Sequence, residues 1–202
     1  LTVIRSFITQ ISLGKYLAFQ ALMAAVVFIF SFATKKIELL IILLLVSIAG
    51  LVAPVFESHA ASSGSHSLVI GSLVIHVIAL SLWVGGVIAL GTLSAEDRPV
   101  AVPRFSQMAL WSAIAVVISG AVNAWARLNF ADAWNSSYSF IVLGKIVATV
   151  ILVFIGYLHR KTLANKKSIN WTGFAKLITV EAAIMVVTVL MGTWLSTSAS
   201  PD

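Results

Sequence analysis

The chain has 202 residues, of which 60% are hydrophobic and 10% charged. A soluble domain is typically about 45–50% apolar and about 25% charged, and a mean hydropathy of +1.05 lies far outside that class. A single soluble core could not bury so much apolar surface, so the composition predicts an integral membrane protein. The absence of cysteine excludes disulfides, thiolate zinc sites, iron–sulfur clusters and thiol catalysis.

Long apolar segments recur along the chain. A membrane-spanning helix needs about 20 mostly apolar residues, and six segments meet that requirement. They are too long and too uniformly apolar to be strands of a membrane barrel. The sequence therefore predicts an all-α polytopic membrane protein, with an N-terminal lead-in over residues 1–15 and a bundle of six transmembrane helices within residues 16–202. The predicted helices cover residues 16–34, 37–56, 67–93, 105–126, 138–158 and 174–195.

The basic residues are distributed unequally between the two sides of this bundle. Nine lie in or beside the connections that follow the first, third and fifth helices, three lie on the opposite side, and Lys145 lies inside the fifth helix. The positive-inside rule makes the side with nine cytoplasmic, so both termini and the loop from Glu57 to His66 are expected on the extracytoplasmic side. The formal net charge of +6 is then a matter of topology. Because the basic residues are scattered over three short loops, no nucleic-acid partner is expected.

Motifs of soluble-type enzymes are missing from the sequence. It contains no Gly-rich phosphate loop, no HExxH and no GxSxG, so we expect no hydrolase or nucleotide-dependent enzyme. The first residue is Leu and no signal-peptide pattern opens the chain, which we interpret as a fragment of a longer protein or a chain whose start is missing.

Three ionisable side chains lie inside predicted helices, where each costs about 2.5–3.5 kcal/mol on insertion scales and so indicates a function or a partner. They are His76, Lys145 and Glu181. His76 is a candidate metal or haem ligand, or a neutral side chain that bonds a neighbouring helix. Glu181 lies closer in depth to His76 than to Lys145, so the count along the helices favours a Glu181–His76 hydrogen bond. Glu181 is expected to balance charge or relay protons, or to be a protonated structural carboxylic acid. Lys145 is likewise a candidate for charge balance or proton relay.

A second group of candidates lies toward the outer side. Glu57, His59 and His66 place three possible metal ligands within ten residues of the outer loop. Met185 and Met191 lie in the outer half of the last helix, and thioether sulfur suits Cu(I). The alternative for the histidines is chance occurrence in a loop, and for the methionines it is ordinary core packing.

Small residues in the third helix indicate close contact with a neighbouring helix. Gly85 and Gly86 have no side chain to hold a partner away. This pattern concerns assembly of the bundle and says nothing about chemistry.

Several short motifs, taken in order, resemble the CopD copper-resistance (copper transport) membrane domain. Over about residues 50–201, the chain is similar to that family in the sequence pieces Ser58-His59-Ala60, His76, Trp83-Val84-Gly85-Gly86, Arg104-Phe105-Ser106, Gly120 with Asn123 and Arg127, Leu143-Gly144-Lys145 and Glu181. At Ser58 the family usually has Gly.

The resemblance implies copper transport or copper delivery in a bacterial cytoplasmic membrane. Copper, as Cu(I) or Cu(II), would be collected by His59 and His66 with Glu57, and would pass to His76 and the Met185/Met191 face. Family members act alone, with an extracytoplasmic CopC-type copper protein, or fused to a cytochrome-oxidase assembly module of the CtaG type, from which this chain could be cut. The alternatives are a haem-binding redox protein that uses His76, and a metal-free scaffold for oxidase assembly. For a bis-histidine haem, His159 lies at the cytoplasmic end of the fifth predicted helix.

Overall fold

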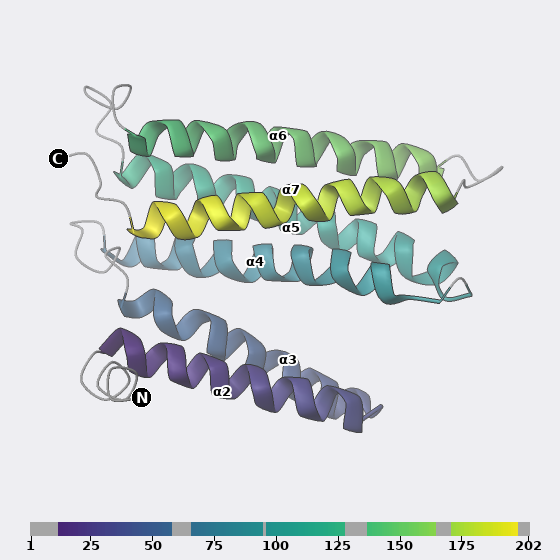
Figure 1. The fold of residues 1–202 in the computed structure, drawn as a ribbon, viewed down its shortest axis with the longest axis horizontal. Coiled ribbons are helices and arrows are strands. Elements are labelled where there is room, and N and C mark those ends of the chain that lie inside the picture. The colour runs from purple at the N-terminus through teal and green to yellow at the C-terminus, as the bar shows by residue number, and fades with distance from the viewer. Residues whose placement is uncertain (1–11, 58–65, 95, 128–136, 165–170, 198–202) are drawn as a thin grey trace. The chain divides into compact units, whose positions relative to one another are not determined.

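The computed structural model describes residues 12–57, 66–94, 96–127, 137–164 and 171–197, and every regular element in these ranges is a helix. Six of the helices are long and apolar enough to cross a membrane, which confirms the predicted all-helical class. In chain order (Figure 1) they are α2 (Ser12–Ala33), α3 (Ile37–Val52) extended by the 3-10 helix η1 (Ala53–Glu57), α4 (His66–Thr92), α5 (Arg98–Arg127), α6 (Ser137–Ala164) and α7 (Trp171–Thr197).

Large apolar side chains are exposed on these helices. Phe32 is 78% exposed and Trp111 62% exposed. Soluble proteins rarely expose extended apolar patches, whereas hydrocarbon chains of a bilayer solvate them. A helix also satisfies its own backbone hydrogen bonds, which lipid requires. The exposed apolar surface and the helix lengths therefore describe one multi-pass membrane protein.

The chain divides into two compact units, and the first comprises residues 1–78. It holds α2, α3, η1 and the first part of α4. The helices α2 and α3 approach closely at Gly50, where an added Cβ would lie 3.2 Å from the Cβ of Met23. The connection between them is short, and the Lys36 N–H donates to the Thr34 hydroxyl at 3.2 Å.

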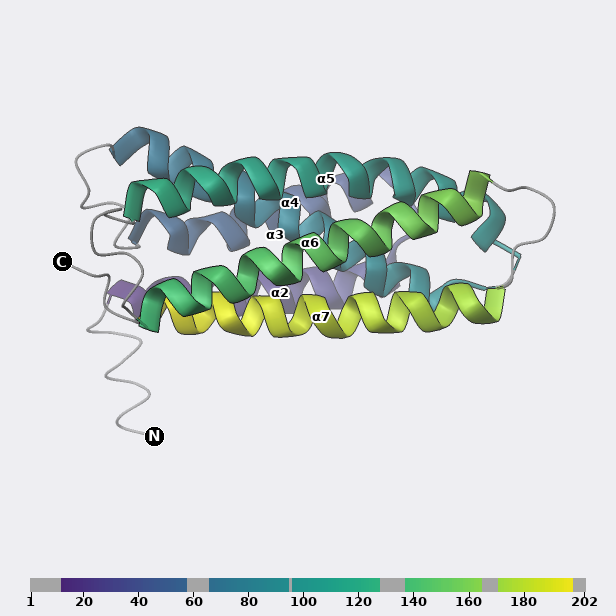
Figure 2. The ribbon, with the colours of Figure 1, turned by 90° about the horizontal axis from the view of Figure 1, so that it is seen from above.

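The second unit comprises residues 79–202 and contains the rest of α4 with α5, α6 and α7. In this unit α6 packs against both α5 and α7 (Figure 2). Its core is apolar and draws on all four helices, through Ala79, Trp83, Val87, Val116, Leu152 and Met185. A smaller apolar cluster of Leu90, Val102 and Phe174 lies nearer the Thr92 end of α4.

Several helix ends differ from the sequence prediction. The α-helix predicted to reach residue 56 ends at Val52 and continues as η1, which contains Pro54, a residue without a backbone N–H. The helix predicted from residue 105 begins at Arg98, and the Asp97 carbonyl accepts the backbone N–H of Val100 and Ala101. Pro103 is the sixth residue of this helix, just past the first turn, and supplies no backbone N–H there.

The start of α2, the end of α6 and the start of α7 each lie beyond the predicted bound, because charged residues do not stop a helix at the membrane surface. α2 starts at Ser12, inside the predicted lead-in, and includes Lys15. The fifth predicted helix was drawn to residue 158 and extends to Ala164. The last starts at Trp171 instead of residue 174. Long basic side chains can keep their charge in the headgroup region while their backbone continues the helix.

Candidate functional site

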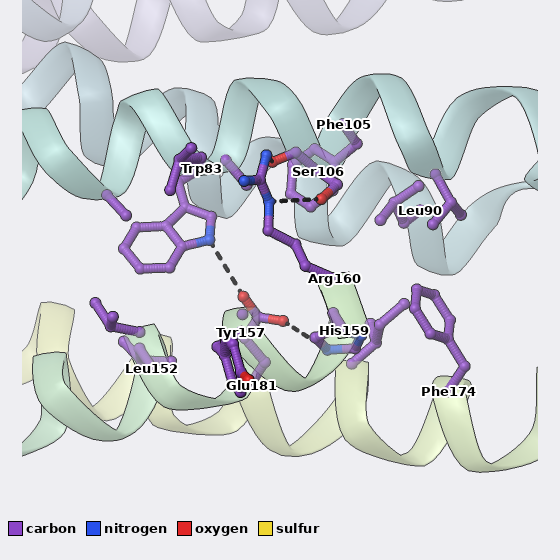
Figure 3. Close-up of a pocket in the computed structure, with 17 residues that line it drawn as sticks. Trp83, Leu90, Phe105, Ser106, Leu152, Tyr157, His159, Arg160, Phe174 and Glu181 are labelled. Carbon is purple, nitrogen blue, oxygen red and sulfur yellow. Dashed lines mark hydrogen bonds and ion pairs between the residues drawn. The ribbon is translucent and has the colours of Figure 1, made fainter. Parts of the chain in front are cut away.

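A carboxyl group is buried among the apolar helices of the second unit. Glu181 of α7 is only 4% exposed. Its Oε1 accepts a hydrogen bond from the indole Nε1 of Trp83 on α4 at 3.2 Å (Figure 3). Trp83 is itself buried in the apolar core. Because burying a polar group without a partner costs free energy, this bond fixes both the carboxyl orientation and the position of α7 against α4.

The second oxygen of this carboxyl group faces a histidine on α6. His159 Nε2 lies 3.2 Å from Glu181 Oε2, a distance that admits an ion pair when the imidazole is protonated. The contact does not have hydrogen-bond geometry, since both ring nitrogens of His159 are buried and make no hydrogen bond. The imidazole also meets the Phe174 ring edge to face, with ring centroids 4.6 Å apart and planes at 78°. His159 is thus held by packing rather than by hydrogen bonds.

Trp83, His159 and Glu181 line one cavity of about 310 Å³. The lining comes from α4, α5, α6 and α7 and is mostly aliphatic and aromatic. Ligand pockets begin at about 300 Å³, so the cavity has room for a small ligand or for several water molecules. Tyr157 lines it and is 59% exposed, so the cavity reaches the outer surface of the helices.

Arg160, the neighbour of His159, also lines the cavity but is engaged elsewhere. Its guanidinium donates to the Ser106 hydroxyl and carbonyl, each at 3.2 Å, and to the Gln107 side chain at 3.1 Å. These bonds tie α6 to α5. Among the described residues, the imidazole of His159 is the basic group within ion-pair distance of Glu181.

The candidates predicted in the outer loop lie at or beyond the edge of the described structure. His59 is outside the described residues. Glu57 ends η1 and His66 begins α4, and their side chains are outside the described part. The predicted grouping of these three side chains therefore stays a prediction.

His76 is half-buried on α4 and belongs to the first unit. It was the expected partner of Glu181. The structure places Trp83 and His159 against the two Glu181 oxygens instead. A role of His76 as a metal ligand stays a prediction.

The two methionines of α7 make packing contacts. Met185 is 1% exposed and belongs to the apolar core beside Trp83 and Leu152. The Met191 methyl group occupies the space that a side chain at Gly144 would need. These contacts support the packing alternative, and metal binding by either sulfur stays a prediction.

Lys145 is directed toward the Thr197 end of α7. A Cβ added at Gly192 would lie 3.5 Å from its Nζ. Gly192 is eleven residues beyond Glu181 on α7, or about 16 Å along the axis. The absence of a direct Lys145–Glu181 salt bridge, expected from helix depth, agrees with this placement.

Sequence reasoning did not place His159 in the site. It ended the fifth helix at residue 158, which put His159 at the membrane surface. With α6 continuing to Ala164, His159 lies inside the helix and beside Glu181. The sequence held a usable signal, because His159 and Glu181 lie on consecutive helices that share one short connection.

The fold and this buried polar site define an all-helical multi-pass membrane protein. Residues 99–195, which include α6 and most of α5 and α7, match the family model of copper resistance protein D, CopD. Copper transport protein CutJ of Bacillus subtilis (strain 168) is 27% identical over 160 residues, which cover 75% of this chain and 29% of CutJ. The chain thus spans less than a third of that curated relative. No solved structure matches the chain significantly.

These matches agree with the resemblance seen in the short motifs. Both matches support an assignment of the chain to the CopD family. His159 and Glu181 both lie within the region that the family model matches, whereas Trp83 lies before it.

Proposed function

We propose that this chain is a membrane domain for copper transport or copper delivery without enzymatic activity. The observation that carries the proposal is the buried Glu181 carboxyl. It faces His159 within the residues that match the CopD family model, and it accepts a hydrogen bond from Trp83 of α4, which precedes them. Ionisable groups persist inside a membrane protein where they mark ion pathways or proton relays. The relative CutJ is named as a copper transport protein, which agrees with this cargo.

Copper enters from the outer face in this proposal. His59 and His66, with Glu57, collect the ion. It then passes to a site near His76 and the Met185/Met191 face. Imidazole and thioether donors both suit copper. Glu181 balances the charge of the ion or relays protons, and Lys145 fixes a helix interface or holds an anion near the outer end of α7.

The orientation follows from the basic residues. Nine of them lie at the ends or connections after α2, α4 and α6, which we place in the cytoplasm by the positive-inside rule. Both termini then lie outside a bacterial cytoplasmic membrane. This orientation exposes the outer loop to an extracytoplasmic CopC-type copper protein. The other proposed partner is a CtaG-type oxidase assembly module, fused to this membrane domain.

The proposal is tested by copper bound per chain in purified protein, measured by elemental analysis together with a visible spectrum. We expect about one copper per chain without a Soret band, and a loss of copper in the His59→Ala/His76→Ala double variant. A Soret band would instead identify a haem protein. Absence of both copper and haem after loading under reducing and oxidising conditions would favour the metal-free assembly scaffold.

A further inference from the structure

The donor atoms of His159 and Glu181 are arranged as they would be around a shared ion. We infer that His159 Nε2 and Glu181 Oε2 form a copper site toward the Ala164 end of α6, separate from the outer loop and from His76. The inference rests on the proposed function for the identity of the ion. The site itself rests on the contacts of the described helices.

The geometry between the two side chains carries the first step. Nε2 and Oε2 are 3.2 Å apart, yet no hydrogen bond joins them. Two donors that bind one first-row metal ion at about 2.0–2.1 Å lie about 2.8–3.4 Å apart, for ligand angles between square-planar and tetrahedral values. The observed separation of 3.2 Å falls in this range, so the two atoms are close enough together to bind one ion.

The second step is the need for a cation at this place. The Glu181 side chain is 5% exposed and the His159 side chain 10% exposed, in an apolar environment. Both His159 nitrogens are buried and unsatisfied, a feature that native proteins rarely retain without a role. Arg160 is the nearest basic residue along α6, and its bonds to Ser106 and Gln107 direct it away. A bound cation would give Nε2 a partner and neutralise the carboxyl at once.

The surroundings leave the pair available to an ion. Trp83 uses Oε1 of the carboxyl and leaves Oε2 to face His159. The Phe174 ring fixes the imidazole by an edge contact. The adjoining cavity of about 310 Å³ gives room for water to complete the coordination. Figure 3 shows Glu181 between Trp83 and His159, with Arg160 turned toward Ser106.

The donor set indicates which ion the site holds and how firmly. One imidazole and one carboxylate form a nitrogen–oxygen set, which suits Cu(II), and copper lies at the top of the affinity order of divalent first-row ions. Groups of three or more His, Cys, Asp or Glu that could hold a metal are absent from the described residues. Two protein ligands make a weak site, and an ion pathway needs sites that are weak enough to release the ion.

The test uses the fact that the chain has only four histidines, His59, His66, His76 and His159. Replacement of the first three by Ala leaves His159 as the sole imidazole. This protein is loaded with Cu(II) in lipid nanodiscs and measured by electron spin-echo modulation, which detects the remote nitrogen of a copper-bound imidazole. We expect that signal, and we expect its loss when His159→Asn is added. Glu181→Gln should weaken Cu(II) binding at least tenfold.

Trp111→Phe is the matched control, since Trp111 is a tryptophan of α5 that is 62% exposed. The sole-histidine protein with Trp111→Phe should keep the imidazole signal. A folded, helical sole-histidine protein without that signal would overturn the inference, and so would an equal signal after His159→Asn. If wild-type protein still binds copper in either case, the proposed function stands. If wild-type protein binds no copper, both fail.

Discussion

Glu181 connects three helices through one carboxyl group. It extends from α7, accepts the Trp83 indole of α4 on one oxygen and faces His159 of α6 with the other. In lipid the helices have no hydrophobic driving force for association, so such polar contacts and close packing hold the bundle together. Glu181 therefore has a structural contribution in addition to its proposed part in copper handling.

Removal of the indole donor should lower stability. Trp83→Phe leaves Oε1 of Glu181 without its hydrogen bond, which costs about 1 kcal/mol, with a further loss from the smaller ring. We expect the midpoint of thermal unfolding in detergent to fall by roughly 2–4 °C or more. Trp111→Phe is the control, because Trp111 is 62% exposed and should leave the midpoint unchanged. Equal midpoints for wild type and Trp83→Phe would contradict the role of this bond.

The sequence predicted some of the site residues and missed others for a physical reason. Glu181 was recognised because an ionisable group in an apolar segment is costly wherever it faces. Its partner His159 was not, because the fifth helix was predicted to end at residue 158, and because helix depth gives one coordinate only. The rotation of each helix about its axis decides which side chain meets Glu181, and packing sets that rotation.

At the scale of the helices, two neighbouring glycines on α4 have different surroundings. A Cβ added at Gly86 would overlap the Phe105 ring and lie 3.0 Å from the Met108 methyl, both on α5. A Cβ added at Gly85 would meet nothing within 4 Å. The sequence predicted close approach at both positions, and the structure assigns it to Gly86.

Gly86→Ala should therefore separate α4 from α5, while Gly85→Ala should not. An aromatic ring cannot move aside as a flexible chain end does, so we expect a loss of about 1–3 kcal/mol for Gly86→Ala. Gly85→Ala should be neutral or stabilising by up to about 1 kcal/mol, through helix propensity. Thermal unfolding of the two variants in the same detergent compares them directly. A Gly86→Ala protein as stable as Gly85→Ala would show that the helices do not approach here.

The existence of the helices was predictable from the sequence, and their ends were less so. The length of an apolar segment alone identifies a membrane span. In lipid, a uniformly apolar segment satisfies its backbone hydrogen bonds by forming a helix. The ends depend on how basic side chains and prolines are accommodated at the surface. α5 begins at Arg98 in spite of Pro103, and α6 continues past Arg160 to Ala164.

At the scale of the molecule, the amino-acid composition alone predicts an integral membrane protein. The mean hydropathy of +1.05 agrees with the structure, in which many Phe, Ile, Leu, Val and Trp side chains are exposed on the helices. The match of residues 99–195 to the CopD family model is the basis of the proposed link to copper. The path of the ion was beyond sequence reasoning, because it depends on side chains that come together only after the helices pack.

The central claim is that copper enters this helix bundle. The most direct measurement is copper in the lumen of proteoliposomes that contain the chain, after addition of Cu(I) or Cu(II) outside, with protein-free vesicles as the control. We expect saturable copper entry above the protein-free rate and a reduced rate for Glu181→Gln. Folded protein that neither binds copper nor carries either ion into the lumen would contradict it.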